Sequence, residues 1–129
     1  MVSHHTPSGI HPPFAAYSHG IAVPPGARWM VCSGQLGIGI DGIIPADADD
    51  QARLCFENIK VILADAGMAL SDIVRINAFV SDREYLKPYM AARDRFVSDP
   101  PPASTLMVVS GFARPEFKVE VEVIAAKVD

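Results

Sequence analysis

The sequence predicts a two-layer domain with the element order β-β-α-β-α-β-β, in which two helices cover one face of a β-sheet. One stretch carries apolar residues at three- and four-residue spacing, which is typical of an amphipathic helix. A second stretch opens with a capping-box pattern, and short runs of strand-forming residues flank both. Two consecutive β-α-β units favour right-handed crossovers, which place both helices on the same face of the sheet.

The composition indicates a single globular domain without an electrostatic footprint for nucleic acid. The chain has 129 residues, of which 50% are hydrophobic and 20% charged, enough for one core. The 11 basic and 15 acidic residues give a formal net charge of -4, and no cluster of Lys or Arg stands out. A nucleic-acid partner is therefore not expected.

The N-terminal residues 1–13 are rich in Pro and His and predict an irregular arm. They show no basic segment followed by an apolar run, so a secretory signal is not expected. No apolar stretch approaches the roughly 20 residues of a membrane helix, and we expect no membrane partner and a cytoplasmic location. Cys32 and Cys55 are predicted to be buried thiols in a reducing compartment, although their number alone leaves a disulfide open.

The first half of the chain predicts a hairpin, a glycine-containing loop and the first helix. Residues 16–23 and 29–34 are strand-like and are joined by a Pro-Pro-Gly turn, so we expect them to pair. Asp47 or Asp49 is the expected N-cap of a helix that ends at Gly67 in a left-handed conformation.

The second half predicts a strand over residues 72–80, a helix with Pro88 in its first turn that ends near Val97, and strands over 104–109 and 118–128. The sheet face away from the helices would carry a mixture of polar, charged and apolar side chains: Arg75, Asn77, Phe79, Glu120 and Glu122. Because such a face suits neither a core nor open water, we expect a homo-oligomer.

Several motifs in this order resemble the RidA/YjgF family of small proteins across nearly the whole chain. They are AYSHGIAV with Tyr17, SGQ from Ser33, Gln51 with ENIKVILADAG, DIVRINAFVSD, the Pro-Ala pair before the fourth main strand, and VEVEVIA near the end. Their order and spacing are together more specific than any one of them.

The resemblance implies an α+β, chorismate-mutase-like fold with a mixed sheet and two helices on one face. It also implies a homotrimer with a central barrel of sheets and with small-molecule sites in the clefts between subunits. The best-known members hydrolyse reactive enamines and imines to keto acids and ammonia, and the resemblance implies no cofactor.

The resemblance also assigns expected roles to individual residues. Tyr17 matches a tyrosine of the cleft, Gly34 a glycine whose backbone lies against the ligand, and Glu120 a glutamate that holds the attacking water. The remaining substrate-binding residues expected by this comparison are Ser33, Tyr89, Ser104, Thr105 and Leu106.

Two positions depart from the family pattern. The family motif before the fourth main strand is Pro-Ala-Arg-Ser/Thr, whereas this chain has Ser104 in place of the arginine. A serine cannot copy the two-pronged grip of a guanidinium on a carboxylate, so we expect poor activity on simple 2-imino acids. The second departure is in the second helix, where the family's asparagine is expected at Pro88–Tyr89.

Other candidate residues have a structural as well as a functional interpretation. His19 and Arg114 could supply a positive charge to the cleft, but each is also explained as a solvated side chain. Glu122 could assist Glu120, although an ion pair with Arg75 is the simpler interpretation. The arm histidines lack ligand spacing for a metal.

The resemblance therefore predicts a RidA-like hydrolase related to the enamine and imine deaminases, with Glu120 as its catalytic residue, and a purely structural role of Glu120 also stays open. The alternative is a non-catalytic, ligand-binding or regulatory trimer. An endoribonuclease or translation inhibitor, another label used for this family, is disfavoured by the acidic charge balance.

Overall fold

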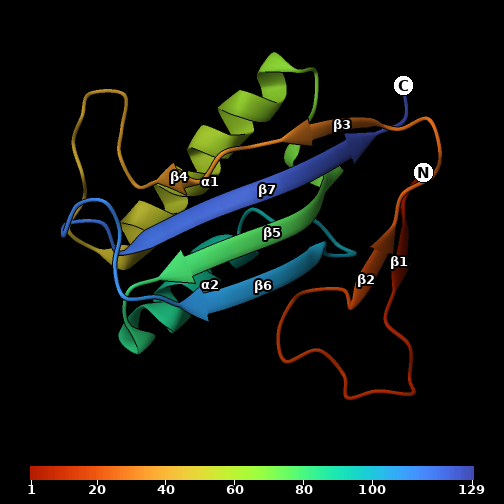
Figure 1. Cartoon of the computed structure of the whole chain (residues 1–129), viewed down its shortest axis with the longest axis horizontal. Coiled ribbons are helices and arrows are strands. Elements are labelled where there is room, and N and C mark those ends of the chain that lie inside the picture. Colours follow the sequence, from red (N-terminus) through yellow and green to blue (C-terminus); the bar gives the residue numbers. More distant parts are fainter.

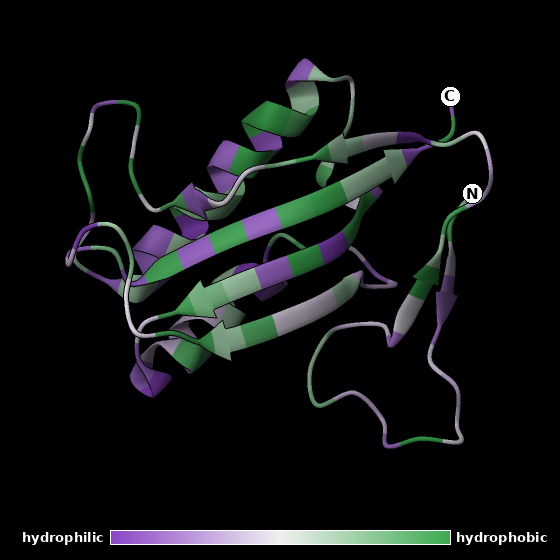
Figure 2. Ribbon diagram, viewed as in Figure 1, coloured by the Kyte–Doolittle hydropathy of each residue, from purple (hydrophilic) through white to green (hydrophobic).

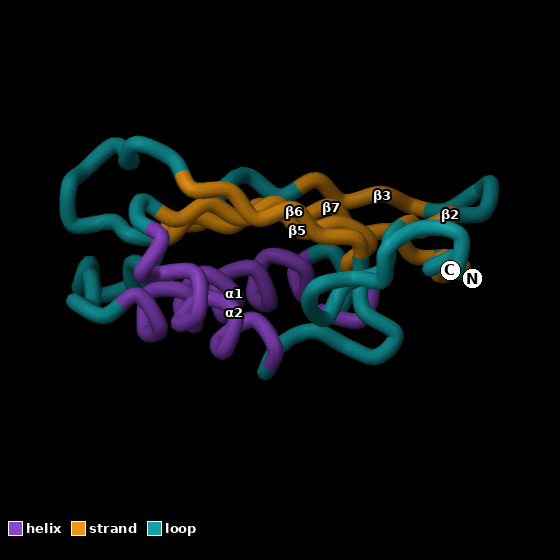
Figure 3. The backbone as a smooth tube through the Cα atoms, turned by 90° about the horizontal axis from the view of Figure 1, so that it is seen from below, coloured by secondary structure: helices purple, strands orange, loops and turns teal.

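The computed structural model describes residues 1–129 as a sheet with both helices packed on one of its faces (Figures 1 and 3). The strands are β1 Ser3–His5, β2 Gly20–Ala22, β3 Arg28–Val31, β4 Gln35–Leu36, β5 Ile73–Val80, β6 Ala103–Val108 and β7 Val119–Lys127. The helices are α1 Ala48–Asp65 and α2 Leu86–Asp94. This is the α+β arrangement, with a mixed sheet and two helices, that the sequence predicts.

The main sheet has the strand order β3-β7-β5-β6, and β4 also pairs with β7. The β5 and β6 strands run parallel and are connected through α2, whereas β7 is antiparallel to each of its partners. This order makes β6 an edge strand, and it places the long strand β7 between β5 and the two short strands β3 and β4 (Figure 1).

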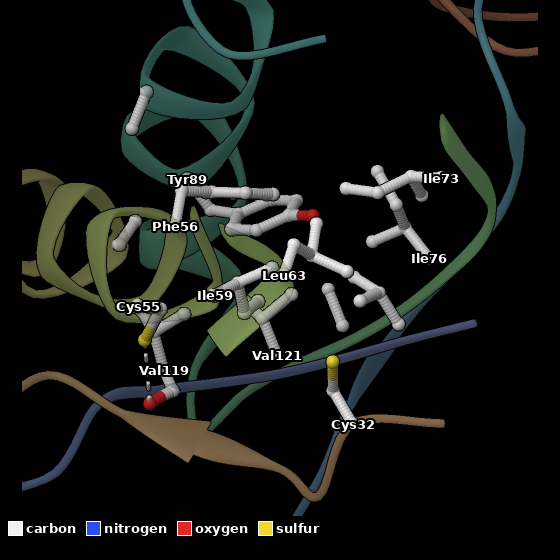
Figure 4. Close-up of a cluster of buried hydrophobic side chains, with 14 of the residues drawn as sticks. Cys32, Cys55, Phe56, Ile59, Leu63, Ile73, Ile76, Tyr89, Val119 and Val121 are labelled. Atoms are coloured by element: carbon white, nitrogen blue, oxygen red, sulfur yellow. Dashed lines mark hydrogen bonds between the residues drawn. The ribbon is translucent and has the colours of Figure 1, made fainter. Parts of the chain in front are cut away.

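The core lies between the sheet and the two helices. Alternate residues of β7, starting at Val119, are buried against the helix layer, and Ile76 and Ala78 of β5 join them. From α1, Phe56 and Ile59 have no exposed surface (Figure 4). Burial of such aliphatic and aromatic side chains is the main favourable term in folding.

Both cysteines are free and buried, as the sequence predicts. Cys55 has no exposed surface, and its thiol lies 3.9 Å from the Val119 carbonyl oxygen (Figure 4). Burial raises the pKa of the Cys55 thiol to about 12, which keeps it protonated and unreactive. Cys32 is 4% exposed on the other side of the core.

The predicted hairpin between residues 16–23 and 29–34 is wrong. The β2 strand pairs with β1 in a separate two-stranded sheet, with His4 opposite Ile21. The β3 strand pairs instead with β7, with Val31 opposite Ile124. The nine-residue β7 offers β3 a long partner in the main sheet, and sequence proximity does not decide such pairing. The arm predicted as irregular therefore contains a short strand.

The helix boundaries follow local signals closely. Gly67, just beyond α1, has a φ of +70°, the left-handed conformation expected there. The Asp82 carboxylate accepts a hydrogen bond from the Glu84 amide at 2.9 Å in the turn before α2, and Pro88 lies in the first turn of that helix. The α2 helix ends at Asp94, earlier than the predicted Val97.

One face assignment in β5 differs from strict alternation. A register irregularity between Ile73 and Arg75 turns Ile73 into the core, where it is 8% exposed. Strict alternation along β5 would place Ile73 on the same face as Arg75. No helix is both long and apolar enough to cross a membrane.

Candidate functional site

A pocket of about 290 Å³ opens beside the edge strand β6, on the helix side of the sheet. It is lined by Phe14, Ala15, Tyr17, Met90, Arg93, Ser104 and Leu106. These residues come from the N-terminal arm, from α2 and from β6. Three of the predicted site residues, Tyr17, Ser104 and Leu106, therefore meet although they lie far apart in the sequence.

The strand register decides which way Ser104 faces. Ser104 lies opposite Ile76 on the parallel strand β5, and Ile76 is fully buried under the helices. Residues directly opposite each other share a sheet face, so Ser104 also faces the helix layer. Thr105 consequently faces the other side, where its hydroxyl accepts a hydrogen bond from Arg75 Nη2 at 3.0 Å.

Tyr17 is held at the pocket by the segment that precedes β6. The neighbouring Ser18 is 4% exposed, and its hydroxyl donates to the Pro101 carbonyl oxygen at 2.5 Å. The Ser18 amide donates to the Pro102 carbonyl oxygen at 3.0 Å. The Tyr17 hydroxyl accepts a hydrogen bond from the Phe14 amide at 3.2 Å, which orients the ring within the arm.

Arg93 gives the same pocket a buried positive charge. Its side chain is 3% exposed, whereas the side chain of its ion-pair partner Asp94 is 53% exposed. Nε and Nη2 of Arg93 both donate to the same oxygen, Asp94 Oδ1, at 3.2 and 3.0 Å. Nη1 makes no hydrogen bond within the chain.

A second group of predicted site residues lies around Glu120 on β7. Gly34, on the segment between β3 and β4, approaches this carboxylate so closely that a Cβ at position 34 would lie 2.7 Å from Glu120 Oε2. Ser33 is exposed beside Gly34, and its carbonyl oxygen accepts a hydrogen bond from Gln35 Nε2 at 3.1 Å.

The Glu120 carboxylate is half-buried and has no hydrogen-bond or ion-pair partner in the chain. Burial is the main cause that raises its pKa above the usual value, and the nearby charge of Glu122 raises the pKa further. A carboxylate with these properties can hold a water molecule and accept a proton from it.

The predicted ion pair between Glu122 and Arg75 does not form. Glu122 Oε1 instead accepts a hydrogen bond from Asn77 Nδ2 at 3.2 Å, because Asn77 lies directly opposite Glu122 in the sheet. Arg75 lies opposite Ile124 and donates to Thr105. Glu122 therefore has a structural partner, whereas Glu120 has none.

The two groups lie on opposite faces of one sheet. Glu120 is opposite Phe79 and shares the open face with Glu122, where hydrophilic bands interrupt β7 in Figure 2. Ser104 faces the helices on the edge strand β6, which is separated from β7 by β5. One chain does not bring Ser104 and Glu120 together.

The open face combines these polar groups with exposed apolar side chains. Trp29 and Val31 on β3 are 55% and 73% exposed, and Met107 on β6 is 49% exposed. Val31 lies opposite Ile124 of β7, which belongs to the same face. Exposed apolar side chains on a sheet face are a feature of interaction surfaces in many proteins.

Three other predicted residues lie outside both groups. Tyr89 is fully buried against Phe56, and its hydroxyl has no hydrogen-bond partner (Figure 4). His19 packs edge-on against Tyr17, and its Nε2 is bonded to the His11 carbonyl oxygen at 2.8 Å. Arg114 is 57% exposed and paired with Glu116 at 2.7 Å.

Sequence reasoning missed Met90 and Arg93. Adjacent helical residues point about 100° apart, so Tyr89 enters the core whereas the next residue, Met90, lines the pocket. Arg93 follows Met90 by three residues on the same helix face, a spacing that would have indicated both together.

Comparison with known proteins agrees with this arrangement. Residues 9–127 match the family described as Endoribonuclease L-PSP, which is the RidA/YjgF family. The chain belongs to this family. It is 32% identical to the RutC family protein YjgH of Escherichia coli over 117 residues, which cover 89% of this chain and 88% of YjgH.

Further members of the family extend the likeness to the whole chain. The 2-iminobutanoate/2-iminopropanoate deaminase of Escherichia coli is 28% identical over 131 residues, covering 98% of this chain and 96% of the deaminase. The crystal structure of YyfB from Yersinia pestis, a Rid protein of unknown function, superposes with a TM-score of 0.86 at 26% identity and 98% coverage of both chains. Escherichia coli TdcF with bound serine gives a TM-score of 0.73 at 30% identity, covering 95% of this chain and 94% of TdcF.

Proposed function

We propose that this RidA family protein is a hydrolase that deaminates a small reactive enamine or imine. Simple 2-imino acids are poor substrates in this proposal, and the site lies between the subunits of a homotrimer. The relatives include the 2-iminobutanoate/2-iminopropanoate deaminase of Escherichia coli. The observation that carries the proposal is the unpartnered, half-buried Glu120 carboxylate beside Gly34.

The chemistry that fits this carboxylate is hydrolysis of a C=N bond. An enamine first accepts a proton from solvent on carbon and becomes a protonated imine. Water then adds to the imine carbon while Glu120 accepts one water proton, which gives a neutral carbinolamine. Return of that proton to nitrogen lets ammonia leave as the C=O bond forms and the hydroxyl proton is released to solvent. The raised pKa of Glu120 favours the first of these transfers, because a carboxylate of higher pKa is the stronger base towards the water proton.

A homotrimer is the assembly that the proposal requires, because Tyr17 and Ser104 lie on the other side of the sheet from Glu120. A cleft that joins the Tyr17 side of one subunit to the Glu120 side of the next would complete the site. The apolar part of the open face around Val31 supports burial of that face between subunits. Light scattering should give three times the chain mass of 13.9 kDa.

Ser104 sets the proposed substrate apart from 2-imino acids. Its hydroxyl offers one neutral donor where the family pattern described above has a guanidinium, and it cannot form two parallel hydrogen bonds to a carboxylate. Turnover of freshly generated 2-iminopropionate should therefore be slow compared with the Escherichia coli deaminase. Equal turnover would contradict this part of the proposal.

The test of catalysis is ammonia release from enamines and imines generated in the assay. Glu120→Gln should lower kcat by about 100-fold or more, the usual effect of removing a general base. Glu57→Gln is the matched control, since Glu57 is exposed on α1 and pairs with Arg53. Equal activity of the two variants would exclude Glu120 as the base.

The second candidate is a trimer that binds a small ligand without consuming it. The neutral Ser104 favours it, because a site that has lost a charged anchor can keep its shape while losing its chemistry. A ligand that stabilises the protein against heat and is recovered unchanged supports this candidate.

RNA cleavage, which the family description names, is disfavoured by the net charge of -4 and should be absent from the pure protein.

A further inference from the structure

The pocket beside Ser104 holds a charge that the chain itself does not fully satisfy. The Arg93 side chain is 3% exposed, and buried charges are normally paired and hydrogen-bonded. Arg93 has a single partner, Asp94, which it contacts through two nitrogens and one shared oxygen. The Asp94 side chain is about half exposed, so solvent screens the attraction between its carboxylate and Arg93.

The remaining donor of this guanidinium has no partner. Nη1 of Arg93 makes no hydrogen bond within the chain, and Arg93 is one of the residues that line the pocket. Ser104 and Tyr17 provide hydroxyl groups in the same lining, and the rest of it is apolar. One cation, a few polar groups and apolar walls are the usual composition of a site for a small organic anion.

We propose that Arg93 is the anion-binding residue of this pocket and holds the carboxylate of a small organic acid through Nη1. Because Arg93 extends from α2, the carboxylate lies against the helix rather than against β6. The favoured ligands are therefore acids with a carboxylate separated from the reacting carbon, which a simple 2-imino acid such as 2-iminopropionate cannot offer. The assignment of such an acid as substrate rests on the proposed function, but the binding of the anion does not.

Binding of matched acids and amides tests this assignment without any need for turnover. The probes are propionate, butyrate, succinate and glutarate, each beside its amide, titrated into the oligomeric protein by calorimetry. The wild-type protein should bind each of the longer acids more tightly than it binds the corresponding amide. Arg93→Met should lower the affinity for the acids by about 30-fold or more and leave the affinity for the amides within about twofold of wild type, because only the charge is lost.

The matched control is Arg95→Met, which removes the same charge two residues along from a side chain that is 56% exposed and paired with Asp49. Its affinity for the acids should equal that of the wild type. Acid binding by Arg93→Met within about threefold of wild type, or an equal loss in Arg95→Met, would overturn the proposal.

A second variant tests the same idea without altering the buried arginine. Asp94→Asn removes the competing carboxylate from an exposed position at the end of α2, where loss of a negative charge suits the helix dipole. It should tighten acid binding about threefold or more and leave the amides unchanged. Unchanged or weaker acid binding would contradict the proposal, even if Arg93→Met does not fold.

The two proposals can fail separately. Loss of acid binding in Arg93→Met without any deaminase activity in the wild type would support the anion site and refute the proposed reaction. Deamination by the wild type together with undiminished acid binding in Arg93→Met would support the reaction and refute the anion site.

Discussion

Gly34 and Glu120 lie so close together that a single methyl group at position 34 would stand 2.7 Å from the carboxylate oxygen Oε2. The absence of a side chain at position 34 therefore leaves the space in which the carboxylate lies. The colliding atom is the end of a flexible side chain, so the protein can relieve the clash by moving Glu120.

Gly34→Ala should consequently lower kcat/KM by about tenfold or more while the melting temperature changes little, since the carboxylate and not the backbone moves. The matched control is Gly111→Ala, because an added Cβ at Gly111 meets no atom within 4 Å. Steady-state kinetics and calorimetry measure the two effects. Full activity in Gly34→Ala would show that the position of Glu120 is unimportant.

The raised pKa of Glu120 predicts a pH dependence of activity. As the base must be ionised, kcat/KM should rise with pH through an apparent pKa above the ordinary 4.5 of a glutamate. Glu122→Gln removes one of the two causes of the shift and should move this apparent pKa downward. A pH–rate profile that stays in place after Glu122→Gln would contradict the assigned cause.

The same pKa predicts the direction in which Glu120 affects stability. A carboxyl whose pKa is raised on folding contributes stability that is fully present below its unfolded pKa and is lost as the pH rises through its folded pKa. Glu120→Gln should therefore gain stability relative to wild type as the pH rises across this window. Urea denaturation at several pH values measures the difference, and a constant difference would contradict the prediction.

The open sheet face predicts the effect of a charge on assembly. Val31 on β3 is 73% exposed in the single chain, and Val61 on the outer side of α1 is 71% exposed. Both should tolerate glutamate as folded chains, but only Val31→Glu should abolish the proposed trimer, because it places a charge in the proposed contact. Light scattering with circular dichroism tests this, and a trimeric Val31→Glu would exclude this face as the interface.

The shared lining of Ser104 and Arg93 predicts that their effects are coupled. Ser104→Arg places a second guanidinium beside the first and should cost about 1–3 kcal/mol of stability, which Arg93→Met should restore in the double variant. The double variant should also turn over 2-iminopropionate faster than the wild type. Additive stabilities in urea denaturation of the four proteins would show that the two side chains do not meet.

Local signals explain most of what the sequence predicts correctly. The left-handed Gly67, the cap at Asp82 and the position of Pro88 depend on a few neighbouring residues, so they can be inferred without the tertiary structure. The partner of β3 could not be inferred in this way. Its pairing with β7 joins residues about a hundred positions apart, and no local pattern encodes that choice.

The candidate site also combines features that local sequence patterns predict with features that depend on tertiary contacts. Alternation along β6 indicates that Ser104 and Thr105 face opposite ways, and the structure shows this. Arg93 could not be assigned from the sequence, because its role depends on α2, β6 and the N-terminal arm meeting at one place. The hydrogen bond between Ser18 and Pro101, which holds the arm at the pocket, joins segments that are distant in the sequence. No periodic sequence pattern predicts such a contact.

The placement of Ser104 and Glu120 on opposite sides of one sheet has a genetic consequence. A chain damaged only at Tyr17 still carries an intact carboxylate, and a chain damaged only at Glu120 still carries an intact pocket. In the homotrimer proposed above, dissociating the two inactive proteins and reassembling them together should give mixed trimers, in which some clefts combine Tyr17 of one variant with Glu120 of the other. The proposed assembly therefore predicts that an inactive Tyr17 variant and an inactive Glu120 variant restore each other's activity.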